Sequence, residues 1–249
     1  MHRDRHQSGL AKSSGVVHDI RLAREIAQPP GSSPTITDIP YRAVSIFPSI
    51  WLARTRVTAN QITLLWGFLG LIAVTGLAWP SQAVRIGAAV LLEFSYLLDF
   101  VDGEVARLQH RTSKRGFFYD LSAHGLIKAG LFLAVGYHVN TSVGGSVYLI
   151  LAFLACVTIS NANSLPFFAA HAGVRPNEGD KNVEMDSQQS RKPFLKRVFS
   201  LAGLFFESPG IYALVLLAAL FDRFDWLLLF YGFLGPFWYL YRLRKFRYE

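Results

Sequence analysis

Residues 99–124 gather side chains whose types and spacing could bind a metal ion and a phosphate group. Apolar segments flank this stretch, yet it contains Asp99, Asp102, Asp120, Arg107 and His124. Ionisable side chains at the edge of a bilayer are costly, so a cluster of them indicates a functional site. Clustered carboxylates favour a hard divalent cation such as Mg²⁺ or Mn²⁺, and Arg107 supplies a planar fork for phosphate.

Helix periodicity places these residues on two faces. At 3.6 residues per turn, one face spans roughly 140° and holds Asp99, Asp102, Gly103, Ala106 and Arg107. A second face spans roughly 80° and holds Gly116, Asp120 and His124. The basic linker 108–115 would join the two helices as an antiparallel hairpin, so carboxylates from both would converge. Such carboxylates repel one another unless a cation lies between them, and the glycines leave room for a bulky ligand beside the backbone.

The spacing resembles the signature of the CDP-alcohol phosphotransferase (CDP-alcohol phosphatidyltransferase) family. That signature is D-x2-D-G-x2-A-R-x8-G-x3-D-x3-D, and the chain matches it at Asp99, Asp102, Gly103, Ala106, Arg107, Gly116 and Asp120. His124 stands where the family has its fourth aspartate. The segment Thr58 to Thr63 resembles the family's P-N-x-x-T entry to the first spanning helix, with Ala59 in place of proline.

The resemblance implies an enzyme that transfers a substituted phosphoryl group from a CDP-alcohol donor to an alcohol acceptor and releases CMP. It implies that Asp99, Asp102 and Asp120 ligate the metal, while Gly103, Ala106, Arg107 and Gly116 cradle the CDP group. It also implies a homodimer. Asn60 and Thr63 would contact the nucleotide, although as residue types they equally suit the N-cap region of a helix.

His124 is the departure from the family pattern. The family's fourth aspartate is a metal ligand and general base, and a neutral imidazole can also accept a proton near neutral pH. His124 is therefore predicted to be both a metal ligand and the catalytic base, beside Asp120. The alternatives are a histidine that only packs or ligates metal, a degenerate protein that binds nucleotide or lipid without turnover, and a transporter-like membrane protein.

Composition predicts an all-α integral membrane protein. The 249 residues are 51% hydrophobic and 17% charged, with a mean hydropathy of +0.28, which is more apolar than most soluble domains. Six segments are long enough to span a bilayer: 62–79, 83–107, 116–138, 145–168, 199–221 and 226–243. The net charge of +8 would suit nucleic acid, anionic lipid or membrane topology.

The positions of the basic residues favour topology over nucleic acid. Lys and Arg concentrate before the first span, in 107–115, in 170–197 and at the C-terminus, whereas only Arg85 and Arg223 fall in the opposite loops. The positive-inside rule therefore places both termini and the motif hairpin in the cytoplasm. Resemblance to bacterial lipid synthases implies the bacterial inner membrane, phospholipid biosynthesis and CDP-diacylglycerol as donor. A smaller CDP-alcohol donor and the identity of the acceptor stay open, as do the roles of Lys128 and the 170–192 loop.

The chain divides into an N-terminal tail and a membrane domain. Residues 1–38 are polar and are predicted to form a disordered cytoplasmic tail without a signal peptide. Residues 39–249 would form the membrane domain. Its first segment, 39–56, mixes aromatic residues with arginines, which favours an amphipathic helix in the headgroup plane, interrupted by Pro40 and Pro48, over an ordinary linker.

Overall fold

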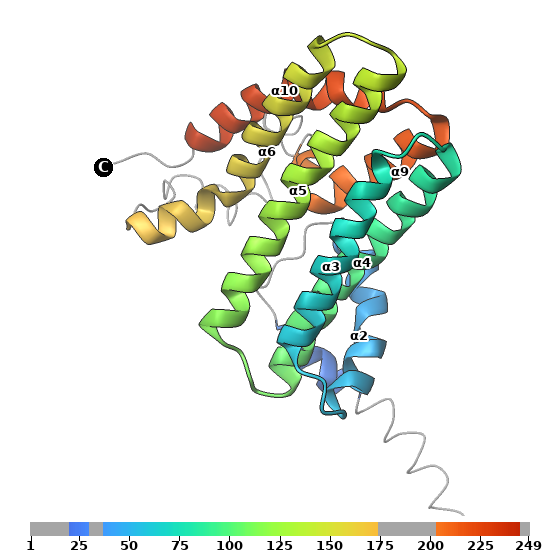
Figure 1. The fold of residues 1–249 in the computed structure, drawn as a ribbon. Helices are drawn as coiled ribbons and strands as arrows, with labels where there is room; N and C mark the ends of the chain where they lie inside the picture. The colour runs from blue at the N-terminus through green and yellow to red at the C-terminus, as the bar shows by residue number, and fades with distance from the viewer. Residues whose placement is uncertain (1–19, 30–36, 174–202, 245–249) are drawn as a thin grey trace, which may run out of the picture. The chain divides into compact units, whose positions relative to one another are not determined.

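The computed structural model describes residues 20–29, 37–173 and 203–244, and these contain helices but no strand, which confirms the all-α class. Residues 20–27 are helical. The other helices, labelled as in Figure 1, are α2 (Ile39–Ala53), α3 (Ala59–Leu77), α4 (Gln82–Leu108), α5 (Lys114–Ser142), α6 (Val147–Ala172), α9 (Ser208–Phe221) and α10 (Phe224–Arg244).

Local signals fix the ends of the helices that carry the motif. At the start of α3, the Thr58 amide donates to Gln61 Oε1 at 2.9 Å and the Gln61 amide donates to Thr58 Oγ1 at 3.4 Å, a reciprocal capping box. At the start of α5, the Gly116 amide donates to Ser113 Oγ at 3.0 Å. Beyond the end of α4, His110 adopts a positive φ of 52°, which turns the chain out of the helix. The motif linker is therefore short and defined at both ends.

The chain divides into two compact units, one of residues 1–66 and 95–121, the other of 67–94 and 122–249. In the first unit, buried Ile62, Val101 and Val105 form a cluster against which Leu52, Val57 and Leu98 pack. This cluster joins the end of α2, the start of α3 and the second half of α4. It therefore supports the start of α3 and helix α4, which carries the first half of the motif.

Close helix packing organises the second unit, where α6 and α10 lie against each other. A Cβ atom at Gly232 would lie 2.7 Å from a Leu151 methyl group, and one at Gly235 would lie 2.6 Å from Thr158 Oγ1. Buried Tyr231 donates its hydroxyl to the Phe205 carbonyl at 2.6 Å. The pair of glycines in α10 therefore permits the close contact that their spacing suggests.

Two helices have the length and composition of membrane spans among the described residues, at Ala59–Leu77 and Val147–Ala170. The six predicted spans are not confirmed. Helices α4 and α5 are long, but each carries ionisable motif residues that lower its hydropathy. The predicted span 199–221 is interrupted, because residues 203–206 are helical, Glu207 is extended with φ −90° and ψ 160°, and α9 begins at Ser208. Residues 199–202 lie outside the described residues.

The N-terminal part of the chain differs from the sequence prediction in two respects. Residues 20–27, inside the predicted tail, are helical with Ala27 fully buried, while 1–19 and 30–36 lie outside the described residues. The prolines at 40 and 48 do not interrupt α2, because Pro40 lies in the first turn, where its missing N–H costs nothing, and the helix continues through Pro48. The location of α2 in the headgroup plane stays a prediction.

Candidate functional site

A cavity of about 260 Å³ in the first unit collects most of the predicted site residues. The start of α3, the end of α4, the linker and the start of α5 all contribute to its walls. Eight of the ten predicted site residues line it: Asn60, Thr63, Asp102, Gly103, Ala106, Arg107, Gly116 and Asp120. Two further predicted residues, Asp99 and His124, are not among the lining residues.

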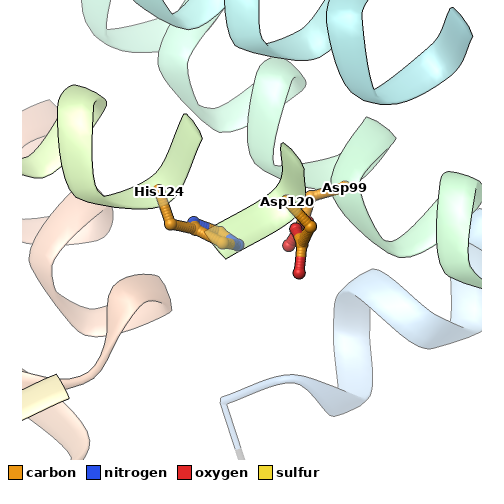
Figure 2. A group of neighbouring side chains, drawn as sticks. All are labelled: Asp99, Asp120 and His124. Atoms are coloured by element: carbon orange, nitrogen blue, oxygen red, sulfur yellow. The ribbon is translucent and has the colours of Figure 1, made fainter. Parts of the chain in front are cut away.

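Asp99 and His124 instead meet Asp120 in a group of potential metal ligands. One ligand atom from each of the three side chains lies within 4.8 Å of the other two, and all three residues are half-buried. Figure 2 shows the His124 ring directed toward the two carboxylates, one helical turn beyond Asp120 on the same helix α5. Two carboxylates and an imidazole at this separation are a donor set that suits a divalent cation such as Mg²⁺ or Mn²⁺.

Asp102 is not part of that group. It is only 7% exposed, and its Oδ2 accepts hydrogen bonds from Thr63 Oγ1 at 2.6 Å and Trp66 Nε1 at 2.7 Å. Thr63 therefore holds the Asp102 carboxylate in addition to lining the cavity. Trp66 was missed by the sequence analysis, although its position three residues after Thr63 puts it on the same helix face.

Two glycines allow polar groups to lie against the backbone at the cavity. A Cβ atom at Gly116 would lie 2.9 Å from Asn60 Oδ1, which is closer than a Cβ atom approaches an oxygen. At Gly103 it would lie 3.4 Å from both terminal nitrogens of Arg107. The absence of a side chain at Gly116 thus lets the Asn60 amide lie close to the helix backbone, whereas the Arg107 guanidinium lies at ordinary van der Waals distance from Gly103. Both glycines leave room for a bulky ligand.

Glu104, between Gly103 and Arg107, is a second residue that the sequence analysis missed. It is 1% exposed, and its carboxylate accepts hydrogen bonds from Ser45 Oγ at 2.7 Å, Ser49 Oγ at 2.6 Å and Gln28 Nε2 at 2.7 Å. A buried carboxylate needs such partners because leaving it unpaired is very costly. The available signal was a carboxylate on the apolar side of a helix, where an ionisable residue demands an explanation.

Comparison with known proteins identifies related sequences. A family model described as CDP-alcohol phosphatidyltransferase matches residues 56–181. Two curated relatives are both named "Bifunctional IPC transferase and DIPP synthase". The one from Aquifex aeolicus (strain VF5) is 30% identical over 105 residues, which is 42% of this chain and 24% of the relative. The one from Thermococcus kodakarensis is 33% identical over 106 residues, which is 42% of this chain and 23% of the relative.

The matched region contains the whole motif. The chain spans about a quarter of the length of the curated relatives it matches, so the likeness concerns one part of those proteins. The family model, by contrast, covers just over half of this chain and includes all ten predicted site residues, from Asn60 to His124. The resemblance inferred from the motif is thereby confirmed, and the chain belongs to the CDP-alcohol phosphatidyltransferase family.

Proposed function

We propose that this protein transfers a substituted phosphoryl group from a CDP-alcohol to the hydroxyl of a second alcohol and releases CMP. The observation that carries this proposal is the cavity in the first unit, which is lined by eight residues of the family motif and helix entry. Membership of the family supports the same reaction.

The chain's own groups suggest how the donor is held. The Arg107 guanidinium lies over Gly103 and can present two parallel N–H donors to phosphate oxygens. The close approach of Asn60 to Gly116 puts an amide at the cavity wall, where it would hydrogen-bond the nucleotide. Ala106 and the two glycines have little or no side chain, so they leave space for the ligand at that wall. These residues would bind and orient the CDP group.

The metal ligands in this proposal are the carboxylates of Asp99 and Asp120, with Asp102 also in the cavity wall. A neutral imidazole has one free lone pair and cannot hold a metal ion and accept a proton at once, so metal ligation by His124 is the alternative to its role as base. A bound Mg²⁺ or Mn²⁺ would neutralise charge on the diphosphate and on the departing CMP. Asp102 would face the same region with its orientation set by Thr63 and Trp66. Its assignment as a direct ligand stays a prediction.

His124 is proposed as the base. The acceptor oxygen forms a bond to the phosphorus that carries the alcohol group, the bond between that phosphorus and the CMP oxygen breaks, and the hydroxyl proton passes to the imidazole. The His124 ring faces the carboxylates of Asp99 and Asp120, which would stabilise the imidazolium that forms. Positioning of the reacting groups and charge stabilisation supply most of the catalysis in phosphoryl transfer.

A membrane setting and a lipid donor complete the proposal. Large apolar side chains are widely exposed in the second unit, with Phe221 72%, Phe237 67% and Trp226 65% exposed. Such surfaces are unfavourable in water and natural in contact with lipid. We propose a membrane enzyme of phospholipid biosynthesis in the bacterial inner membrane, acting as a homodimer on CDP-diacylglycerol. A small CDP-alcohol is the competing donor.

The donor and acceptor can be identified with purified protein in vesicles containing Mg²⁺. CDP-diacylglycerol and a short-chain CDP-alcohol would each be offered with glycerol phosphate, inositol phosphate, serine and no acceptor, and CMP release would be followed. The proposal expects release that depends on both donor and acceptor, and faster release with CDP-diacylglycerol. If CMP is released with the short-chain CDP-alcohol and an acceptor but not with CDP-diacylglycerol, the lipid donor is rejected and the transferase activity is retained.

Topology provides a separate prediction, because the positive-inside rule predicts that the motif linker faces the cytoplasm. In a Cys156→Ser background, a cysteine at exposed Lys114 should react with an impermeant maleimide only after cells are permeabilised. A cysteine at Val143, which is 63% exposed after α5, should react in intact cells. Labelling of position 114 from outside intact cells would contradict the proposed orientation.

A further inference from the structure

Arg107 is held by a segment that lies outside the motif and far from it in sequence. Its Nε–H group donates to the carbonyl of Ala27, the last residue of the helical segment 20–27. Carbonyls at the end of a helix lack partners within the helix and carry partial negative charge. Donation from Nε fixes the plane of the guanidinium. Its terminal nitrogens lie over Gly103, at the wall of the cavity.

The next residue, Gln28, ties the same segment to the helix that bears Arg107. Gln28 Nε2 donates to Glu104 Oε1 at 2.7 Å and to the Arg42 carbonyl at 2.9 Å. The first bond anchors the segment to α4 three residues before Arg107, and the second anchors it to α2. The carbonyl that holds Arg107 therefore belongs to a segment clamped at the adjacent residue.

Glu104 completes the clamp from within the motif. Its two carboxylate oxygens are divided between Gln28 and the hydroxyls of Ser45 and Ser49, so one buried side chain links the N-terminal segment, α2 and α4. Replacing any of these donors would leave a buried carboxylate oxygen short of a partner. The bonds therefore specify where the end of segment 20–28 lies.

We propose that segment 20–28 and Glu104 position the Arg107 fork for the diphosphate of the donor. Gln28 and Glu104 are positioning residues, since neither lines the cavity and both act through Arg107. The inference rests on the proposed function only in taking a nucleotide diphosphate as the ligand of the cavity. It assigns a role in substrate binding to a part of the chain that lies before the family match.

Binding of CDP with Mg²⁺ to the full-length protein tests this role without requiring turnover. Gln28→Met removes both hydrogen bonds of Gln28 and nearly preserves side-chain volume. In metal sites, loss of a hydrogen bond that orients a ligating group weakens binding by about 10- to 100-fold. We expect a rise of the same order in the Kd for CDP. The KM for the donor should rise in parallel with little change in kcat. Arg107→Ala should raise the Kd for CDP at least as much, because Gln28 acts only through Arg107.

The matched control is Gln82→Met in the second unit. Gln82 Nε2 also donates two hydrogen bonds, to the carbonyls of Ala219 and Leu220 at 3.3 and 3.1 Å, and neither contact involves the cavity. This variant should keep the wild-type Kd for CDP and should lose less stability than Gln28→Met, because its bonds are longer and do not serve a buried carboxylate. A purely structural role for Gln28 predicts that folded Gln28→Met also keeps the wild-type Kd.

A double-mutant cycle with Glu104→Gln provides the second measurement, because Gln28 and Glu104 should be strongly non-additive in CDP binding if they act as one unit. An unchanged Kd for CDP in Gln28→Met would overturn the proposal, as would failure of the wild-type protein to bind CDP. CDP binding that depends on Gln28 without any CMP release would instead reject the proposed reaction and retain the positioning role.

Discussion

Replacing Asp120 with asparagine is expected to lower acceptor-dependent CMP release by about 10³-fold or more. Among the residues that line the cavity, Asp120 is the one that also belongs to the group with Asp99 and His124. Its loss would remove a negatively charged ligand, and metal stabilisation of the transition state is worth several kcal/mol. Initial rates would be measured with saturating donor, acceptor and Mg²⁺. Asp99→Asn and Asp102→Asn should show the same loss.

The matched control for these variants is Asp225→Asn. Asp225 pairs with Arg223 at 3.2 Å, and that arginine is 55% exposed, so the pair contributes little to stability. The rate of CMP release by Asp225→Asn should equal that of the wild type. If Asp102→Asn kept full activity in the presence of EDTA, a metal site built from these carboxylates would be rejected.

The second large effect is expected at His124. His124→Ala should lose about 10²- to 10⁴-fold in kcat, the usual contribution of a general base, while CDP binding is largely kept. The loss should persist at saturating Mg²⁺, because a missing base is not replaced by more metal. His124→Asp restores the family's residue and should retain activity, since a carboxylate at this position can both bind metal and accept a proton.

A different histidine controls for the substitution itself. His110 is exposed and has a positive φ, a conformation that asparagine tolerates, so His110→Asn should turn over at the wild-type rate. If added Mg²⁺ restored the turnover rate of His124→Ala, His124 would be a metal ligand and not the general base. If His124→Ala turned over at the wild-type rate under all conditions, His124 would have no role in the reaction.

The motif helices were predictable because their signals are local. The spans predicted at 62–79, 83–107 and 116–138 correspond to α3, α4 and α5, whose ends differ by up to four residues. A long apolar segment bounded by turn and capping residues specifies a helix without reference to the rest of the chain. The spacing of the motif likewise fixed which residues share a face. Six of these motif residues then line one cavity, together with Asn60 and Thr63 from the start of α3.

What the sequence did not reveal depends on partners distant along the chain. Glu104 bonds to residues 55 and 76 positions away, and periodicity carries no information about such pairs. The helix at 20–27 lies in a tail that is polar as a whole, although five of its own eight residues are Ile, Leu or Ala. Ala27 and Gln28 gain order from contacts with Arg107 and Glu104, which composition does not reveal. Hydropathy does not register the break before α9, but the run Glu207, Ser208 and Pro209 indicates a broken or kinked helix at that point.

The most direct test of the central claim is the stoichiometry of the reaction. Purified wild-type protein with Mg²⁺, a CDP-alcohol donor and an excess of acceptor should form one CMP for every acceptor hydroxyl that becomes esterified. Omission of the acceptor should stop both products, because the donor is cleaved only as the acceptor oxygen attacks phosphorus. CMP formed without esterified acceptor would indicate hydrolysis, and CDP-alcohol binding without CMP formation would indicate a non-catalytic protein. Either result would contradict the proposed transfer.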